Sequence, residues 1–359
     1  MRWKCHECIP LLISAFSGTA RLPFDADKVK FGARSKRNTV RLQPRSTFLA
    51  SAGAGLAGVV LPRVARAQLT SVRVAGGATD VFSSPFYAAA AGTFAKHGLD
   101  IQPTLYNVAT AAAAMGAGSL EMGVADLIAG VSAIAAGVPI VMVAGGGLYR
   151  SPADRAGNVL AAANASPIQS PKDFAGKTIG VPTLVGLTTT CLRAYLPAHG
   201  VALSSVRLIE LPPATMVPSL QRGAIDVALL SEPFVTLGKG DIRIVGYPFD
   251  TAAEHAVNHE FCFAVWYASK AWFEADRDRA RRVVQAIYDS ARWANSHRDE
   301  TLDILIQNRK LDADKIQGMA RVTFATSLTP DLIAPVIDIA NQLNVFAKPV
   351  AVESLIAKV

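Results

Sequence analysis

The sequence predicts an α/β protein built from two similar lobes. From Gln68 onward, short apolar runs rich in β-branched residues alternate with alanine-rich runs of helical length. This alternation favours mostly parallel sheets with helices on both faces. The rhythm then repeats after the polar segment at residues 164–173, which indicates a second α/β unit of similar size. From about Ala275 the pattern becomes helical to the end of the chain.

The first half contains the following expected elements in order. Strands are expected at residues 71–78, 100–106, 120–126 and 139–147, and helices at 85–98, 109–118 and 127–137. Each expected strand has the length and β-branched content of a buried strand, and the helix at 85–98 ends at Gly98, a residue typical of helix ends. A polar segment then separates this unit from the next.

The second half repeats the order. Strands are expected at residues 177–182, 205–211, 224–231 and 241–248, with helices at 187–200, 214–223 and 233–240. Residues 277–297 then show apolar positions three and four apart, the spacing of an amphipathic helix. Further helices are expected after Asp299, Asp312 and Thr329.

The charge of the chain is concentrated at its N-terminus. The formal net charge is +8, but residues 1–67 hold 12 of the 36 Lys and Arg and 3 of the 28 Asp and Glu. The remainder therefore has 24 basic and 25 acidic residues, a net charge of −1. A near-neutral remainder gives no reason to expect a nucleic acid as partner.

Residues 1–67 have the layout of a leader with an export signal. Arg41 and Arg45 precede an apolar stretch, and Ala65-Arg66-Ala67 is a small-x-small cleavage motif before Gln68. The mature protein is therefore expected to begin near Gln68 and to be periplasmic. RSTFL is similar to a twin-arginine signal with Ser46 at the second arginine position, so the export route stays open.

Two motifs in the leader are interpreted as coincidences. Residues 53–58 match the G-x-G-x-x-G spacing but do not lie between a strand and a helix, as a dinucleotide site requires. Cys5 and Cys8 lack the second ligand pair of a metal site. Cys191 and Cys262 remain downstream, where an export compartment permits a disulfide, although two buried thiols are the favoured interpretation.

The acids Asp226 and Glu232 flank one expected strand. Six residues of extended chain place their carboxylates about 20 Å apart, too far for the roughly 5–10 Å that paired catalytic carboxylates need. Asp226 is interpreted as a structural group at the rim of the sheet. Glu232 lies at the carboxyl end of the strand, where ligands bind in open α/β sheets, so it either contacts a ligand or binds nearby backbone donors.

Four segments carry a resemblance to a known family. They are SSPFYAAAAGTFAKHGLDI, GSLEMGVADLIAGVSAIAAGVPI, SPKDFAGKTIGVP and GAIDVALLSEPF, in family order over about 290 residues. Together they resemble the substrate-binding proteins of ABC importers for nitrate, sulfonates, taurine and thiamine-pyrimidine precursors. The resemblance implies a two-lobed periplasmic-binding-protein type II (Venus flytrap) fold, with lobe one at 68–165 plus 261–359, lobe two at 166–260, and two hinge crossings.

The expected ligand-binding residues lie on turns that follow strands. In lobe two, the turn at 183–190 opens a helix whose free N–H groups can hold an acid, and the family uses this turn; capping by a threonine is the alternative. In lobe one, Phe82 either stacks on a planar ligand or packs in the core, and Asp126 either faces the cleft or caps a helix. The full set is Thr79, Phe82, Ser83, Ser84, Asp126, Thr183, Gly186, Thr188, Ser231 and Glu232.

No catalytic residue, cofactor or metal is expected. His255 and His259 are four apart, which would place both on one helical face, but surface histidines are the favoured interpretation. Relatives that synthesise the thiamine pyrimidine carry a cysteine-rich cluster. Only Cys262 lies near the histidine pair in this sequence, which argues against that activity.

The sequence therefore predicts an exported, monomeric receptor that delivers a small solute to a permease and ATPase. An enzyme on the same fold, such as a thiamine-pyrimidine-precursor synthase, and a ligand-sensing module are the alternatives. No arginine lies in the expected loops to clamp an acid, which favours a neutral, heteroaromatic or weakly charged ligand.

Overall fold

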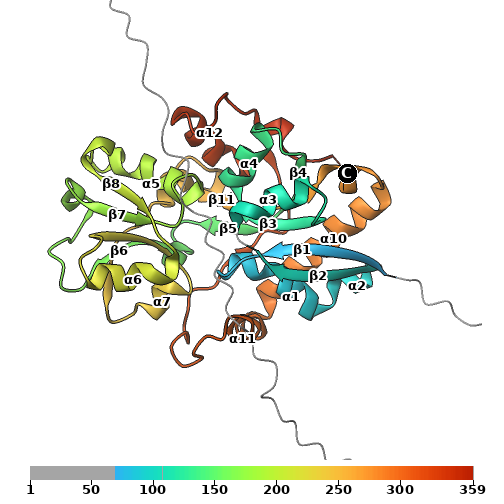
Figure 1. Ribbon diagram of the computed structural model, residues 1–359, viewed down its shortest axis with the longest axis horizontal. Helices are drawn as coiled ribbons and strands as arrows, with labels where there is room; N and C mark the ends of the chain where they lie inside the picture. The colour runs from blue at the N-terminus through green and yellow to red at the C-terminus, as the bar shows by residue number, and fades with distance from the viewer. Residues whose placement is uncertain (1–68, 107, 359) are drawn as a thin grey trace, which may run out of the picture. The chain divides into compact units, whose positions relative to one another are not determined.

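Two five-stranded sheets and a small third sheet organise the protein (Figure 1). The computed structural model describes residues 69–106 and 108–358, so the expected export signal, its cleavage site and the motifs of the leader lie outside the described residues. The first sheet has the order β2-β1-β3-β12-β4 and the second has the order β10-β6-β9-β7-β8. Each sheet with its helices is called a lobe below.

The strands have the following bounds. The first sheet contains β1 (Thr70–Gly76), β2 (Leu99–Leu105), β3 (Met122–Asp126), β4 (Ile140–Gly145) and β12 (Ala264–Ser269). The second contains β6 (Asn158–Ala163), β7 (Thr178–Val181), β8 (Arg207–Glu210), β9 (Val227–Ser231) and β10 (Ile242–Gly246). The third, called the hinge sheet, contains β5 (Gly147–Arg150), β11 (Glu260–Cys262) and β13 (Thr323–Phe324).

The helices divide between the lobes. The first lobe has α1 (Ser84–Ala91), α2 (Thr93–Lys96), α3 (Val108–Gly116), α4 (Leu127–Ala135), α9 (Lys270–Glu274), α10 (Arg277–Ser296), α11 (Arg298–Arg309) and α12 (Ala334–Gln342). The second has α5 (Leu187–Ala198), α6 (Pro213–Gln221), α7 (Phe234–Leu237) and α8 (Asp250–Ala253). Short 3-10 turns are η1 (Val81–Ser83), η2 (Arg155–Gly157), η3 (Pro171–Phe174), η4 (Leu203–Ser205), η5 (Val257–His259), η6 (Pro330–Leu332) and η7 (Val352–Ser354).

Both faces of each sheet are covered by helices, as the sequence predicts. In the first lobe, Val74 packs on the face covered by α1 and α10, whereas Tyr267 packs on the face covered by α3, α4 and α12. In the second lobe, Leu160 packs under α5 and Leu230 under α6. Figure 1 shows α3 and α4 on one side of the first sheet and α1 and α2 on the other. The apolar runs of the sequence are therefore the interior strands.

One strand in each sheet runs against the others. β12 is antiparallel to β3 and β4, and β6 is antiparallel to β9 and β10. Each follows a hinge strand directly, because β5 leads to β6 and β11 leads to β12. A chain that enters a lobe at the carboxyl edge of the parallel strands must run in the opposite direction. Asn158, which opens β6, is accordingly paired with Ser231 at the end of β9.

Three details of the elements differ from the sequence expectation. The second sheet begins at Asn158, whereas the sequence assigned residues up to 165 to the first lobe. The helix expected at 85–98 is interrupted at Gly92, whose φ of 64° lies in the left-handed region that glycine adopts readily. The segment after Asp312 forms turns instead of a helix, and the Asp312 carboxylate accepts a hydrogen bond from the Asp314 N–H.

The hinge sheet contains both chain crossings between the lobes. β5 and β11 are antiparallel partners, with Arg150 opposite Glu260 and Leu148 opposite Cys262. β13 pairs with the other edge of β5. The two crossings are therefore hydrogen-bonded neighbours. The lobes are joined as well by apolar packing, since Leu187 and Cys191 of α5 and Ala252 of α8 belong to the buried cluster that contains α4 and α12.

Candidate functional site

The carboxyl ends of β1, β3, β7 and β9 carry the candidate site. Parallel strands end at the same edge of a sheet, and ligands of open α/β sheets bind at that edge. Thr79, Phe82, Ser83 and Ser84 follow β1; Asp126 ends β3; Thr183, Gly186 and Thr188 follow β7; Ser231 and Glu232 lie at the end of β9. The positions that the sequence selected are thus distributed over both lobes.

The loop after β1 points some of these residues into the first lobe and leaves others at its edge. Phe82 is half-buried against the core, and Gly77 lies directly beneath it. Ser84 lines a small cavity of about 10 Å³ inside the lobe, together with Tyr87 and Trp266. Phe82 and Ser84 are thus placed by packing, and the polar group left at the edge is Thr79.

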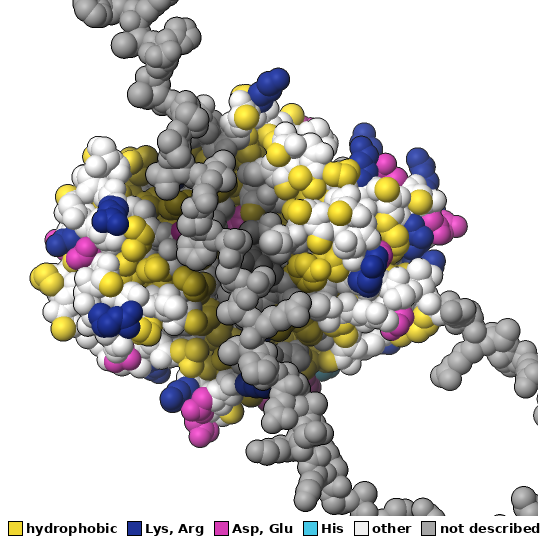
Figure 2. Space-filling view, viewed as in Figure 1, with side chains coloured by type: hydrophobic (Ala, Val, Ile, Leu, Met, Phe, Trp, Pro, Cys, Tyr) yellow, Lys and Arg dark blue, Asp and Glu magenta, His cyan; other side chains and the backbone are white. Residues whose placement is uncertain are grey.

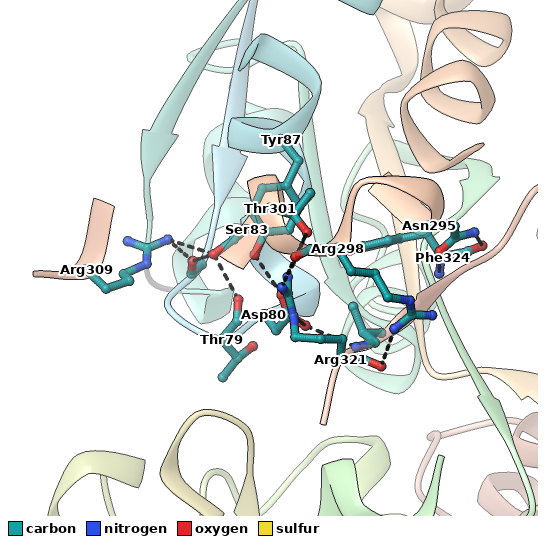
Figure 3. A network of polar contacts seen from close by, with 12 residues as sticks. Thr79, Asp80, Ser83, Tyr87, Asn295, Arg298, Thr301, Arg309, Arg321 and Phe324 are labelled. Carbon is teal, nitrogen blue, oxygen red and sulfur yellow. Dashed lines mark hydrogen bonds and ion pairs between the residues drawn. The ribbon is translucent and has the colours of Figure 1, made fainter. Parts of the chain in front are cut away.

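A buried ion pair anchors this loop to the C-terminal part of the chain (Figure 3). Arg321 donates from Nε to Asp80 Oδ2 at 2.9 Å and from Nη2 to Asp80 Oδ1 at 2.8 Å. Tyr87 Oη and the Val322 N–H also donate to the same carboxylate, at 2.7 and 3.0 Å. Since every acceptor direction of Asp80 is used, the pair is a structural clamp and not a vacant binding group.

A second arginine reaches the same loop from the end of α11. Arg309 Nη2 donates to the Gly77 carbonyl and to Ser83 Oγ, the latter at 3.3 Å, and its guanidinium lies 5.2 Å from the centre of the Phe86 ring. Ser83 Oγ in turn donates to the Thr79 carbonyl at 3.0 Å. The expected loops themselves contain no arginine, and Arg309 reaches Gly77 from 232 residues further along the chain.

The loop after β7 is closed by a carboxylate from the other lobe. Asp126 caps α4 by accepting from the Ala129 N–H at 2.9 Å, and it also accepts from the Leu187 N–H at 3.0 Å through both oxygens. Leu187 is the first residue of α5, so the N-terminus that the sequence offered to a ligand acid already holds Asp126. Asp126 thus caps α4, which is one of its two interpretations, and its contact with Leu187 joins the two lobes.

The threonines around α5 are occupied by local contacts. Thr183 Oγ1 donates to the Val185 carbonyl at 3.1 Å and accepts from the Val185 N–H at 3.3 Å. Thr189 and Thr190 donate to the carbonyls of Thr183 and Gly186. Thr188 is half-buried on the first turn. These contacts shape the loop so that Gly186 lies against Asp126.

Burial controls the acidity of Asp126. Loss of hydration raises its pKa to about 6, although hydrogen bonds from Ala129 and Leu187 act in the opposite direction. The nearby thiol of Cys191 and phenol of Tyr267 are buried too, and burial raises the pKa of each. The Asp126 carboxyl group therefore changes its charge near neutral pH, and its contact with α5 changes with it.

Glu232 makes the reverse connection, from the second lobe to the first. Its carboxylate accepts from the Thr236 N–H at 3.0 Å, from Thr236 Oγ1 at 2.8 Å and from the Ala320 N–H at 3.3 Å. Burial raises the pKa of Glu232, and the charge of Asp80 adds to the rise. Beside it, Ser231 Oγ donates to Asn158 Oδ1 at 2.8 Å. Glu232 thus binds backbone donors, one of them on the opposite lobe.

The structure also describes Asp226, the pair His255 and His259, and the two downstream cysteines. Asp226 Oδ2 accepts from the Thr178 N–H at 2.8 Å, which confirms its structural role at the rim of the second sheet. His255 and His259 do not share a helical face, because Asn258 and His259 both have a φ of 55°. Cys191 and Cys262 are free, buried thiols.

The chain belongs to the NMT1/THI5-like family, whose model matches residues 81–301. No curated protein sequence matches significantly.

Solved structures share the fold. The alkanesulfonate-binding protein SsuA from Xanthomonas axonopodis pv. citri, bound to MOPS, matches with a TM-score of 0.67 at 15% identity, covering 82% of this chain and 100% of that chain. The periplasmic aliphatic sulphonate binding protein SsuA from Escherichia coli matches with a TM-score of 0.65 at 17% identity, covering 80% and 97%. The periplasmic nitrate-binding protein NrtA from Synechocystis PCC 6803 gives 0.55 at 16% identity, covering 69% of each. The protein therefore has the two-lobed fold of periplasmic binding proteins.

Proposed function

We propose that this protein is the solute-binding receptor of an ABC importer and captures a small organic or anionic solute between its lobes. The observation that carries the proposal is the arrangement of the two lobes. They are joined by the paired strands β5 and β11, and their loops meet at Asp126–Leu187 and Glu232–Ala320. The structural neighbours with this fold include sulfonate- and nitrate-binding proteins, which supports the same role here.

Lobe closure is the motion that this function uses. Opening about the hinge sheet separates Asp126 from α5 and Glu232 from Ala320, and it exposes the loops after β1 and β7. A solute that contacts both lobes shifts the population toward the closed state, because it binds that state better.

Export and delivery complete the proposal. A signal at residues 40–67 would direct the chain to the periplasm, where a monomer would deliver its solute to a permease and ATPase. No helix within residues 69–106 and 108–358 has the length and apolar character to cross a bilayer. On the face shown in Figure 2, basic and acidic side chains are interspersed, which favours a small solute over a nucleic acid as partner.

An enzyme on the same fold is the second candidate, and the described cysteines give it little support. Burial raises the pKa of Cys262 to about 12, and that of Cys191 is raised further by burial and by the nearby Asp126. A nucleophilic cysteine needs the opposite shift and access to solvent. Among residues 69–106 and 108–358, no group of three or more potential metal ligands is assembled.

A thermal-shift screen with recovery of the ligand tests the proposal. Sulfonates, nitrate, pyrimidine precursors, aromatic acids and amides are added to the purified protein. A solute at about a hundred times its dissociation constant adds about 2.7 kcal/mol and raises the melting temperature by several degrees. Recovery of that solute unchanged by mass spectrometry supports a receptor, whereas steady conversion to a product supports an enzyme.

A further inference from the structure

Arg309 is a partly buried cation without a counter-ion. Arg321, the other arginine at the loop after β1, is neutralised by Asp80. Within the part of the chain that the structure describes, Arg309 forms no ion pair, and its hydrogen bonds go to the Gly77 carbonyl and the Ser83 hydroxyl. Burial lowers the pKa of Arg309, and no carboxylate offsets this effect. A cation in such a setting is stabilised by any anion that reaches it.

Two donors without partners lie at this position. Arg309 Nε and Thr79 Oγ1 are both buried atoms that have no hydrogen-bond partner in the described structure. Both residues bind Ser83, whose hydroxyl accepts from Arg309 and donates to the Thr79 carbonyl. Figure 3 shows Arg309 and Thr79 next to Ser83 at the edge of the first lobe. Buried donors are ordinarily satisfied, so a missing acceptor is indicated here.

The alternative position for an anion is already filled. The N-terminus of α5 has the N–H groups and dipole that attract an acid, but Asp126 accepts from the Leu187 N–H there. A second negative group at that helix would face the Asp126 carboxylate. At the loop after β1, by contrast, the cation Arg309 and the hydroxyl of Thr79 have donors without acceptors.

We propose that the ligand carries an acid group, a carboxylate or sulfonate, and that Arg309 and Thr79 bind it. This inference rests on the proposed receptor function and specifies the chemical class of the solute. It reverses the expectation of a neutral or weakly charged ligand, which depended on the absence of an arginine near the expected loops. The guanidinium supplies charge and the Nε donor, and the threonine supplies a second donor to another acid oxygen.

Matched acid and amide pairs test the inference. The probes are benzoate with benzamide, benzenesulfonate with benzenesulfonamide, and butanoate with butanamide, applied to the full chain by thermal shift and then by calorimetry. At least one acid should bind while its neutral partner does not. Arg309→Gln and Thr79→Val should each weaken that acid about tenfold or more, since each removes a bond to a charged group. Arg309→Lys should restore part of the affinity lost in Arg309→Gln, because it keeps the charge.

Arg281→Gln is the matched control. Arg281 is an exposed arginine on α10 that pairs with Asp278 at 2.9 Å, so its loss changes the net charge equally without touching the site. Acid affinity should stay the same in this variant. Thr79→Val tests the inference independently if Arg309→Gln does not fold. The Thr79 hydroxyl makes no hydrogen bond within the described structure, so its removal should not disturb folding.

The inference is overturned if no acid binds better than its amide, or if the preferred acid binds Arg309→Gln and Thr79→Val as well as the original protein. Binding of the amides alone would leave the receptor function standing and remove the anion site. Conversion of a bound probe to a product would overturn the receptor function instead.

Discussion

The loop after β1 and the loop after β7 occupy equivalent positions in the two lobes but have opposite electrostatic character. Each joins a parallel strand to a helix at the edge where ligands bind. The loop after β7 is satisfied by the Asp126 carboxylate from the opposite lobe, whereas the loop after β1 holds Arg309 and Thr79 with donors unused. Equivalent topology therefore does not give equivalent loops, because side chains from elsewhere in the chain decide which of their donors are paired.

The largest expected effect comes from releasing the loop after β1. Asp80→Asn removes the charge that pairs with Arg321, whose side chain is 9% exposed beside a 4% exposed Asp80. Breaking a buried pair from one side costs about 3–5 kcal/mol, because the remaining charge is left uncompensated. Urea unfolding at neutral pH measures the loss. A loss below about 1 kcal/mol would show that the loop is held by its other contacts.

The next effect concerns Asp126 and depends on pH. Burial raises the pKa of Asp126 from 3.8 to about 6, so the folded protein binds a proton that the unfolded chain releases between these values. This contribution to stability is fully present below pH 3.8 and is lost as the pH rises through about 6, a change of about 3 kcal/mol.

Asp126→Asn isolates this contribution. The free energy of unfolding of the original protein minus that of the variant should fall between pH 4 and pH 7, because the amide does not titrate. Cys191 and Tyr267, the titratable neighbours, stay neutral over this range because burial raises the pKa of each. A difference that is flat with pH would mean that Asp126 is hydrated, and thus that the lobes are open in solution.

Glu232→Gln should have a smaller effect. The amide nitrogen replaces one of the carboxylate oxygens that accept from the Thr236 N–H and the Ala320 N–H, so one donor loses its acceptor. An unsatisfied buried donor costs about 1–3 kcal/mol in stability. If Glu232 also holds the solute, calorimetry will show weaker binding in the folded variant; unchanged affinity would assign the residue to lobe contacts alone.

The smallest effects distinguish the loops most directly. Thr183→Val removes a hydroxyl that both donates to and accepts from the Val185 backbone, so stability should fall by about 1 kcal/mol. Thr79→Val removes a hydroxyl without a partner and should leave stability unchanged or slightly higher. Equal losses in the two variants, measured by thermal unfolding, would contradict the difference between the loops.

Most of the order of helices and strands could be predicted from the local sequence pattern, but the two antiparallel strands, β6 and β12, could not. The alternation of apolar and alanine-rich runs predicted β1 to β4, β7 to β10 and most of the intervening helices. β6 and β12 were missed. The run at Asn158–Ala163 is short and alanine-rich, and the direction of both strands follows from where the hinge enters each lobe, which a local pattern does not contain.

Only those residues of the candidate site that lie at the ends of strands could be predicted from the sequence. Asp126 and Glu232 were selected because they end strands, and both lie at the boundary between the lobes. Arg309 and Arg321 were missed because they reach the loop after β1 from more than 200 residues away, and nothing in their own neighbourhood marks them.

Because β5 pairs with β11, the second lobe is also an insertion in the chain whose two ends lie side by side. Its chain leaves the hinge at Arg150 and returns at Glu260, and these two residues lie directly opposite each other in the ladder. A segment whose ends are adjacent can be exchanged for another of different length without altering the path of the surrounding chain. Replacing residues 151–259 with the corresponding lobe of a relative would thus leave Arg309 and Thr79 in place while the rest of the first lobe stays unchanged in sequence.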